Sequence, residues 1–191
     1  MNKTDLKLYA ITDRQWLHGA SLSEHVKLAI EGGATMIQIR DKDILSTDSD
    51  AGLKDEYNEA LEIKRICHEH RVPLIINDNV QFAIDIDADG VHLGQDDMNP
   101  AEARKLLGTD KIIGVTAKTV EQAKKAQADG ADYLGSGAVF GSTTKLNAKP
   151  MTKELLSEIT AAVDIPVVAI GGINADNAST LKGTGIAGIA V

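Results

Sequence analysis

The sequence has little of several residue types that mark particular protein classes. It has one cysteine in 191 residues, so it cannot form an internal disulfide, which is typical of a reducing compartment. Aromatic residues make up only 3%, too few for a platform on which the bases of single-stranded nucleic acid could stack. The formal net charge of -8 argues against a general nucleic-acid or anionic-membrane binder, because either partner would be repelled at long range.

Long apolar runs are also missing. No run reaches the roughly 18 residues that a membrane-spanning helix needs, and residues 1–8 lack the apolar segment of a signal peptide. The 43% hydrophobic content is nevertheless enough for a sizeable core at this length. We therefore expect a cytoplasmic protein with one domain over residues 1–191, acting on small molecules rather than on nucleic acid or a membrane.

The sequence does contain a regular alternation of short β-branched apolar runs and longer amphipathic segments. The runs are nearly continuous, as is typical of parallel strands buried on both faces. The predicted strands are residues 8–12, 36–40, 73–77, 90–93, 112–116, 133–136, 166–170 and 187–191. This pattern predicts an α/β protein with a (β/α)8 TIM barrel. A doubly wound open sheet is the alternative, but no Gly-x-Gly-x-x-Gly follows the first strand.

Helices are predicted between the strands. Apolar spacing places them around residues 22–30, 61–66, 100–107, 120–128, 152–162 and 175–181, with only a short turn at 81–84. Ser21 and Glu24 form a capping box, and Pro100 suits a first helical position. The polar stretch 41–55 is predicted to be a solvated loop over the barrel mouth. Because a barrel should continue past an eighth strand into an outer helix, we expect the domain to be C-terminally incomplete at Val191.

Basic and amide side chains occur at the end of the second strand. Gln38 and Arg40 alternate with apolar residues, so both should point into the barrel. A guanidinium in that interior is costly unless an anion pairs with it, and its planar fork suits phosphate. A buried ion pair with an aspartate is the alternative. Lys42 and Lys145, which follow the second and sixth predicted strands, favour the anion site.

Acidic residues follow the third and fourth strands. Asp78 and Asp97 are candidate ligands for Mg²⁺, which takes one or two carboxylates and completes its shell with phosphates and waters. The alternative is that such aspartates cap the helices that follow them, and for Asp96 that alternative is preferred. Asn77 precedes Asp78 at the end of the third strand, and Thr116 ends the fifth.

Two further loops contain groups that suit phosphate. Ser142, Thr143 and Thr144 offer hydroxyls just before Lys145, although an ordinary turn would have the same composition. Gly171 and Gly172 follow the seventh strand, where a glycine pair lets backbone N–H groups approach a phosphate; a tight turn is the alternative. The histidines fit no zinc spacing, and His92 is interpreted as packing rather than as a site residue.

These strand-end motifs, in this order, resemble the thiamine-phosphate synthase family from about Leu8 to the end of the chain. The motifs are Gln38-Ile-Arg-Asp-Lys42, Ile76-Asn-Asp-Asn79, Val91-His-Leu-Gly-Gln-Asp-Asp97, Ser142-Thr-Thr-Lys145 and Ala169-Ile-Gly-Gly-Ile173. The family couples a pyrimidine methyl diphosphate with a thiazole phosphate, releasing diphosphate with Mg²⁺ bound. The resemblance therefore implies a Mg²⁺-dependent transferase of a pyrimidinylmethyl group in thiamine biosynthesis.

The resemblance also implies a role for each matching residue. Gln38, Arg40, Lys42, Asn77 and Lys145 would hold the pyrimidine diphosphate, and Asp78 and Asp97 would ligate Mg²⁺. Ser142, Thr143 and Thr144 would contact the thiazole phosphate, which Gly172 would help to hold. Arg40, Lys42, Thr116 and Lys145 would be catalytic, because they would stabilise charge on the departing diphosphate.

Three departures from the family pattern bear on these expectations. Many members have Ser where Thr116 stands, and Gly141-Ser142 replaces the more usual Pro-Thr. The sequence also ends before the residues that would complete the thiazole phosphate site, so binding there is expected to be weak.

Two other functions are compatible with the motifs. A thiazole tautomerase shares the fold, but it typically has a catalytic histidine in place of Thr116. A non-catalytic phosphate-binding barrel would not need both Asp78 and Asp97.

Overall fold

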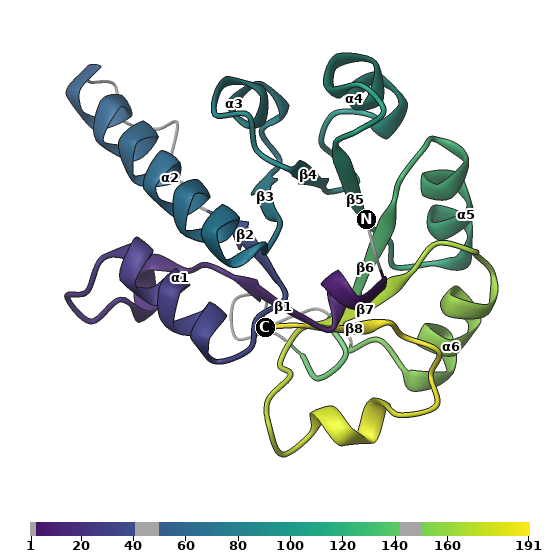
Figure 1. Cartoon of the computed structure of the whole chain (residues 1–191). Helices are drawn as coiled ribbons and strands as arrows, with labels where there is room; N and C mark the ends of the chain where they lie inside the picture. Colours follow the sequence, from purple (N-terminus) through teal and green to yellow (C-terminus); the bar gives the residue numbers. More distant parts are fainter. Residues whose placement is uncertain (1–2, 41–49, 142–149) are drawn as a thin grey trace.

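The computed structural model describes residues 3–40 and 50–191 except for 142–149, with the backbone alone at 50–53. Its strands form a closed parallel barrel in sequence order, in which β8 pairs with β1 (Figure 1). The strands are β1 (Leu8–Ile11), β2 (Met36–Ile39), β3 (Leu74–Asn77), β4 (Gly90–Leu93), β5 (Ile112–Thr116), β6 (Tyr133–Gly137), β7 (Val167–Ile170) and β8 (Gly188–Ala190). The predicted (β/α)8 TIM barrel is confirmed.

Helices surround the barrel and connect successive strands. They are α1 (Leu22–Glu31), α2 (Asp50–His70), α3 (Val80–Asp85), α4 (Pro100–Leu107), α5 (Val120–Ala128) and α6 (Lys153–Ala161). Short 3-10 turns are η1 (Lys3–Leu6), η2 (Arg14–Trp16) and η3 (Ala178–Leu181). The Ser21–Glu24 capping box and Pro100 at the start of α4 are both confirmed.

Two apolar cores hold the fold together. The larger lies between the sheet and the helices, where α1 contributes Leu22, Val26 and Ile30. The smaller fills the barrel interior and includes Tyr9 and Tyr133, whose side chains are fully buried. The two sets arise because successive strand residues point to opposite faces, so each buried strand contributes to both cores.

The helix predicted at 175–181 is wrong in extent, because only the 3-10 turn Ala178–Leu181 forms there. The asparagine side chains explain the difference. Asn177 Oδ1 accepts from Asn174 N at 2.9 Å, and Asn174 Oδ1 accepts from Asp176 N at 3.0 Å. Such local side-chain bonds satisfy backbone groups that a helix would use, and they stabilise a turn instead.

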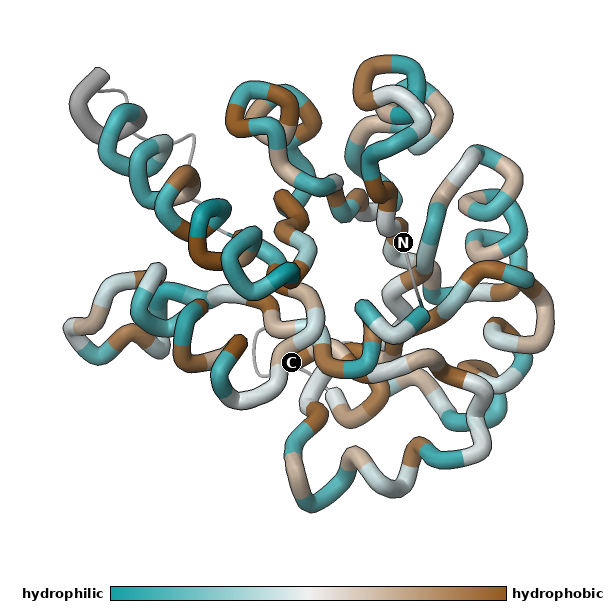
Figure 2. Tube along the Cα trace, viewed as in Figure 1, coloured by the Kyte–Doolittle hydropathy of each residue, from teal (hydrophilic) through white to brown (hydrophobic). Residues whose placement is uncertain are grey.

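The predicted loop 41–55 is wrong over its last residues, since α2 begins at Asp50; residues 41–49 lie outside the described part. The first turns of α2 are rich in polar residues, and Figure 2 shows hydrophilic colours over much of the helix that extends from the barrel. Polarity alone suggested a loop there. Glu, Lys, Leu and Ala are nevertheless good helix formers, and an acidic residue suits a helix start.

Within the residues that the structure describes, no helix is long and apolar enough to cross a membrane.

We expect Cys67 to be unreactive in the native protein. Its side chain is fully buried in the core between α2 and the sheet, and this burial raises the pKa of the thiol to about 12. The thiolate is the reactive form, so Ellman's reagent at pH 8 should react at least ~100-fold more slowly than with the protein in concentrated urea. Equal rates in the two conditions would show that this core is open.

Candidate active site

A cavity with several polar side chains in its walls lies in the barrel at the carboxyl ends of the strands. It has a volume of about 130 Å³ and is lined by Gln38, Arg40, Asn77, His92 and Thr116, together with Tyr9 and apolar residues from β1, β7 and β8. A wider cavity of about 520 Å³ shares Arg40 with it and is also lined by Trp16, Gly171 and Gly172. The structure thus brings together Gln38, Arg40, Asn77 and Thr116 around one cavity, and Gly172 lines the wider cavity together with Arg40.

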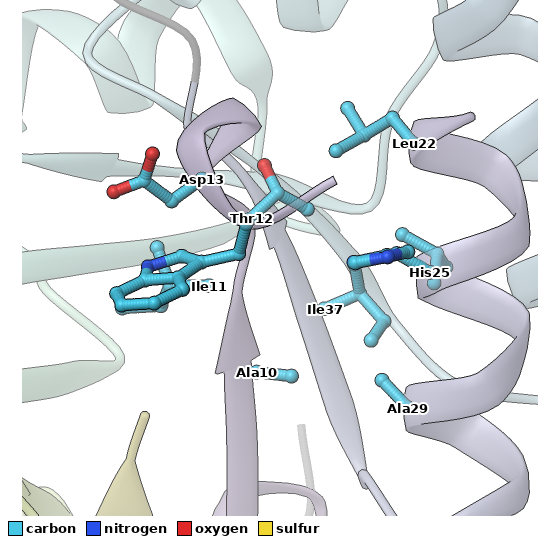
Figure 3. Close-up of a pocket in the computed structure, with 10 residues that line it drawn as sticks. Ala10, Ile11, Thr12, Asp13, Leu22, His25, Ala29 and Ile37 are labelled. Carbon is cyan, nitrogen blue, oxygen red and sulfur yellow. The ribbon is translucent and has the colours of Figure 1, made fainter. Parts of the chain in front are cut away.

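A separate cavity of about 150 Å³ lies on the outer side of the sheet (Figure 3). Ala10 and Ile37 face His25 and Ala29 of α1 across it. Its lining is mainly apolar and contains none of the predicted site residues. The chemistry expected from the sequence therefore belongs to the barrel mouth, where polar groups converge.

Arg40 connects the two mouth cavities. Its backbone N–H donates to Thr12 Oγ1 at 3.0 Å, which fixes the start of the loop after β2 beside β1. Among the described residues, no side chain forms a hydrogen bond or ion pair with the guanidinium, although its charge lowers the pKa of Asp78. The alternative of a buried Arg40–aspartate ion pair is therefore not observed within that part of the chain.

Asp78 and Asp97 come from neighbouring strand ends and lie within hydrogen-bonding reach of each other. Asn77 Nδ2 donates to Asp78 Oδ2 at 2.6 Å, and Gly94 N donates to Asp97 Oδ2 at 2.6 Å. The pKa of Asp78 is raised to about 6. Partial burial is the largest cause, and the neighbouring Asp97 carboxylate is the next largest. Two carboxylates held this close repel each other when both are ionised.

None of these aspartates caps a helix. The N-cap of α3 is Asn79, whose side chain accepts from Phe82 N, and the N-cap of α4 is Asn99, whose side chain accepts from Ala101 N. The capping role preferred for Asp96 is therefore wrong. Asparagine occupies the cap in both loops because it lies directly before the first helical residue.

Polar side chains also cross the barrel below the mouth. Gln38 Nε2 donates to the Tyr9 hydroxyl at 2.6 Å, and the Tyr9 and Tyr133 hydroxyls lie 2.8 Å apart. His92 Nδ1 lies 3.0 Å from the Tyr133 hydroxyl, and His92 Nε2 lies 3.0 Å from Thr116 Oγ1. Burial lowers the pKa of His92 to about 4, so the ring is neutral at pH 7.

The interpretation of His92 as packing missed these hydrogen bonds, and no role was predicted for Tyr9 or Tyr133. The sequence does contain a signal for this network. Side chains with a polar end occupy inward positions of four predicted strands, at Tyr9, Gln38, His92 and Tyr133. A buried tyrosine hydroxyl usually has a hydrogen-bond partner, so such residues on neighbouring strands indicate a network.

The loop after β7 packs against the loop after β6. Gly171 has φ +99° and Gly172 has φ +66°, a region that favours glycine. A Cβ at Gly171 would lie 2.4 Å from Ala138 Cβ, and Phe140 N donates to Gly171 O at 3.0 Å. This close approach requires glycine. The predicted residues Lys42, Ser142, Thr143, Thr144 and Lys145 lie outside the described residues.

The closed parallel barrel, with polar side chains gathered at the carboxyl ends of its strands, defines a (β/α)8-barrel protein with a candidate active site at its mouth. A family model described as "Thiamine monophosphate synthase" matches residues 8–191. The chain therefore belongs to the thiamine-phosphate synthase family, and it is a transferase.

Individual relatives agree with this assignment. The chain is 48% identical to the thiamine-phosphate synthase of Ruminiclostridium cellulolyticum over 190 residues, which cover 100% of this chain and 87% of the relative. It is 45% identical to that of Methanobrevibacter smithii, covering 100% and 88%. The solved thiamine phosphate pyrophosphorylase from Pyrococcus furiosus superposes with a TM-score of 0.85 at 39% identity, covering 99% of this chain and 86% of that one.

Proposed function

We propose that this chain is a thiamine-phosphate synthase of the cytoplasm. It joins 4-amino-2-methyl-5-(diphosphomethyl)pyrimidine to a thiazole phosphate and releases diphosphate. Membership of the family and the similarity to synthases over the whole chain support this activity. The mouth cavity supports it independently, because a cationic side chain, two amides and a hydroxyl line its walls.

The site residues divide by substrate. The pyrimidine diphosphate is held by Gln38, Arg40, Lys42, Asn77 and Lys145. Thr116 forms a hydrogen bond with its diphosphate group. Gly172 offers its backbone to the thiazole phosphate beside the wider cavity, together with Ser142, Thr143 and Thr144. The assignment of the pyrimidine diphosphate site is supported because one cavity is lined by Gln38, Arg40, Asn77 and Thr116.

Asp78 and Asp97 fit a divalent cation such as Mg²⁺. They present two carboxylates side by side at the barrel mouth, and the raised pKa of Asp78 reflects a negative field that a cation would neutralise. Bound Mg²⁺ would supply positive charge to the diphosphate oxygens. The nearby Arg40 guanidinium, whose charge acts on Asp78, would add a second positive charge for the diphosphate.

The reaction proceeds by departure of the diphosphate. The bond between the pyrimidinylmethyl carbon and the diphosphate oxygen breaks, and its electron pair stays on that oxygen. Arg40, Lys42 and Lys145 stabilise the negative charge that develops there, so no general base is required. The thiazole nitrogen then donates its lone pair to the carbocation, which forms the new carbon–nitrogen bond of thiamine phosphate.

The position of the half-buried Arg40 in the wall of the mouth cavity, together with Gln38 and Asn77, carries this proposal, because a guanidinium fork binds phosphate oxygens two at a time. Arg40→Ala should therefore bind the pyrimidine diphosphate about 10- to 100-fold more weakly, as expected for loss of a charged hydrogen-bonded pair. Calorimetry in Mg²⁺ measures this affinity.

Arg65→Ala is the matched control for Arg40→Ala. Arg65 lies on α2, exposed and paired with Glu62 and Glu69, so its loss changes the net charge equally but far from the mouth. It should leave affinity unchanged. Unaltered affinity in folded Arg40→Ala would show that the anion does not bind at this site.

A further inference from the structure

Four hydrogen bonds connect five side chains across the barrel below the mouth, from Gln38 through Tyr9, Tyr133 and His92 to Thr116. Each hydroxyl has one proton, and a neutral imidazole has one N–H. A hydroxyl oxygen can accept from two donors but can donate only once, so the direction of each bond follows from the bond before it when every buried proton must have an acceptor.

Gln38 sets that direction. Its Nε2 can only donate, so the Tyr9 oxygen accepts at 2.6 Å. Tyr9 is buried, and the nearest described acceptor for its own proton is the Tyr133 hydroxyl at 2.8 Å. If Tyr133 donated to Tyr9 instead, the Tyr9 proton would have no acceptor within the described part of the chain, at a cost of ~1–3 kcal/mol.

The same reasoning extends to the far end of the series. Since the Tyr133 oxygen accepts from Tyr9, the Tyr133 proton goes to His92 Nδ1, 3.0 Å away. A nitrogen that accepts has no proton, so the ring proton is on Nε2 and is donated to Thr116 Oγ1 at 3.0 Å. The Thr116 hydroxyl proton is then not used by the series.

We propose that this series runs in one direction from Gln38 to Thr116, holds His92 with its proton on Nε2, and presents the Thr116 hydroxyl as a hydrogen-bond donor to an anion in the mouth. His92 is then a positioning residue that acts through Thr116. The assignment of that anion as the diphosphate of a substrate rests on the proposed function, whereas the direction of the series does not.

The surroundings of Thr116 are suited to this role. Gln95 Nε2 donates to the Thr116 backbone carbonyl at 2.5 Å, which fixes the end of β5. Thr116 and Arg40 line the same cavity, so an anion bound there would lie near both residues. A donor whose direction is set before the ligand arrives needs no reorganisation when negative charge develops. The opposite direction would point lone pairs at the anion.

The first test measures the His92 tautomer in the substrate-free protein. Two-bond nitrogen–proton NMR spectra of the uniformly 15N-labelled chain distinguish Nε2–H from Nδ1–H, and the signal missing in His92→Gln assigns the residue. We expect Nε2–H. An Nδ1–H tautomer would overturn the proposal, because it requires the Gln38 amide to be turned over and Thr116 to donate to His92.

The second test measures the binding of inorganic diphosphate in Mg²⁺ by calorimetry. Thr116→Val should bind about 10-fold more weakly, and Thr116→Ser should bind like the wild type. His92→Gln, whose amide can donate where Nε2 does, should retain affinity that His92→Leu loses. Equal affinity in Thr116→Val and Thr116→Ser would overturn the donor role.

Tyr133→Phe distinguishes orientation of His92 through the hydrogen-bond series from a role of the Tyr133 ring in packing alone. Tyr133 does not line the mouth cavity, and its ring is preserved in the variant. Removing the hydroxyl should mix the two His92 tautomers and weaken diphosphate binding several-fold. An unchanged tautomer and affinity would contradict transmission through the series. Absence of diphosphate binding by the wild type would instead overturn the proposed function. The direction of the hydrogen-bond series is decided by the His92 tautomer alone.

Discussion

Asp78→Asn is expected to reduce the turnover of thiamine phosphate by about 10²–10³-fold and to remove its dependence on Mg²⁺. The change keeps the size of the side chain and removes one of the two carboxylates that lie together at the mouth. A metal ion contributes several kcal/mol of charge stabilisation to the leaving group, which sets this magnitude. The measurement is initial rate against Mg²⁺ concentration for both proteins.

Asp96→Asn is the matched control, because Asp96 is an exposed neighbour in the same loop as Asp97 and does not share the contact with Asp78. It should retain normal rates and a normal response to Mg²⁺. A rate that still rises normally with Mg²⁺ in Asp78→Asn would show that Asp78 is not a ligand.

The same variant has an expected effect on stability that does not depend on activity. The pKa of Asp78 is raised in the folded state to about 6, so the folded protein binds a proton more readily than the unfolded chain. Its contribution to the free energy of unfolding is present below about pH 4 and is lost as the pH rises to about 6. In chelator at pH 7, Asp78→Asn should therefore melt at a higher temperature than the wild type.

Mg²⁺ should reverse that order. Binding to the folded state raises the melting temperature of the wild type, whereas Asp78→Asn should respond weakly. Thermal unfolding followed with and without Mg²⁺ at pH 7 gives both comparisons. A variant that melts lower in chelator, or gains as much from Mg²⁺ as the wild type, would contradict the placement of both carboxylates.

Gly114→Ala is expected to reduce the free energy of unfolding by about 3 kcal/mol or more and to weaken diphosphate binding. Gly114 lies on β5 between His92 on β4 and Tyr133 on β6, and it pairs with both. The two side chains meet across the space that its missing side chain leaves. An added Cβ would lie 2.1 Å from the buried Tyr133 ring, so the ring must move.

Gly33→Ala is the control for this substitution. Gly33 has φ +100°, but a Cβ there meets no atom within 4 Å. Only backbone strain is expected, about 1–2 kcal/mol, with unchanged diphosphate affinity. Urea denaturation and calorimetry measure both variants. A smaller loss of stability in Gly114→Ala than in Gly33→Ala would contradict the packing described for the barrel interior.

The sequence predicted the barrel because its strands are short, β-branched and apolar on both faces. Gly90–Leu93 and Ile112–Thr116 have the predicted bounds, and the other strands differ by one or two residues. The errors arose where local side-chain bonds or helix propensity outweighed the overall pattern. Asn174 and Asn177 replaced a helix with a turn, and polar residues after Asp50 formed a helix.

The site was predicted where residue type and strand position were both informative. Arg40 and Gln38 lie inward at the mouth, as the alternation of the second strand predicts. The bonds among Tyr9, Tyr133 and His92 could not be predicted in the same way, because they depend on which residues face each other across the closed barrel. That depends on the register of strands distant in sequence.

The measurement that tests the central claim most directly is a mass-spectrometric assay of the chain with Mg²⁺, the pyrimidine diphosphate and the thiazole phosphate. Thiamine phosphate and inorganic diphosphate are followed together. We predict that both form in equal amounts in the wild type and that neither forms at a comparable rate in Arg40→Ala. Folded wild-type protein that makes no thiamine phosphate, or an Arg40→Ala variant as fast as the wild type, would contradict the account.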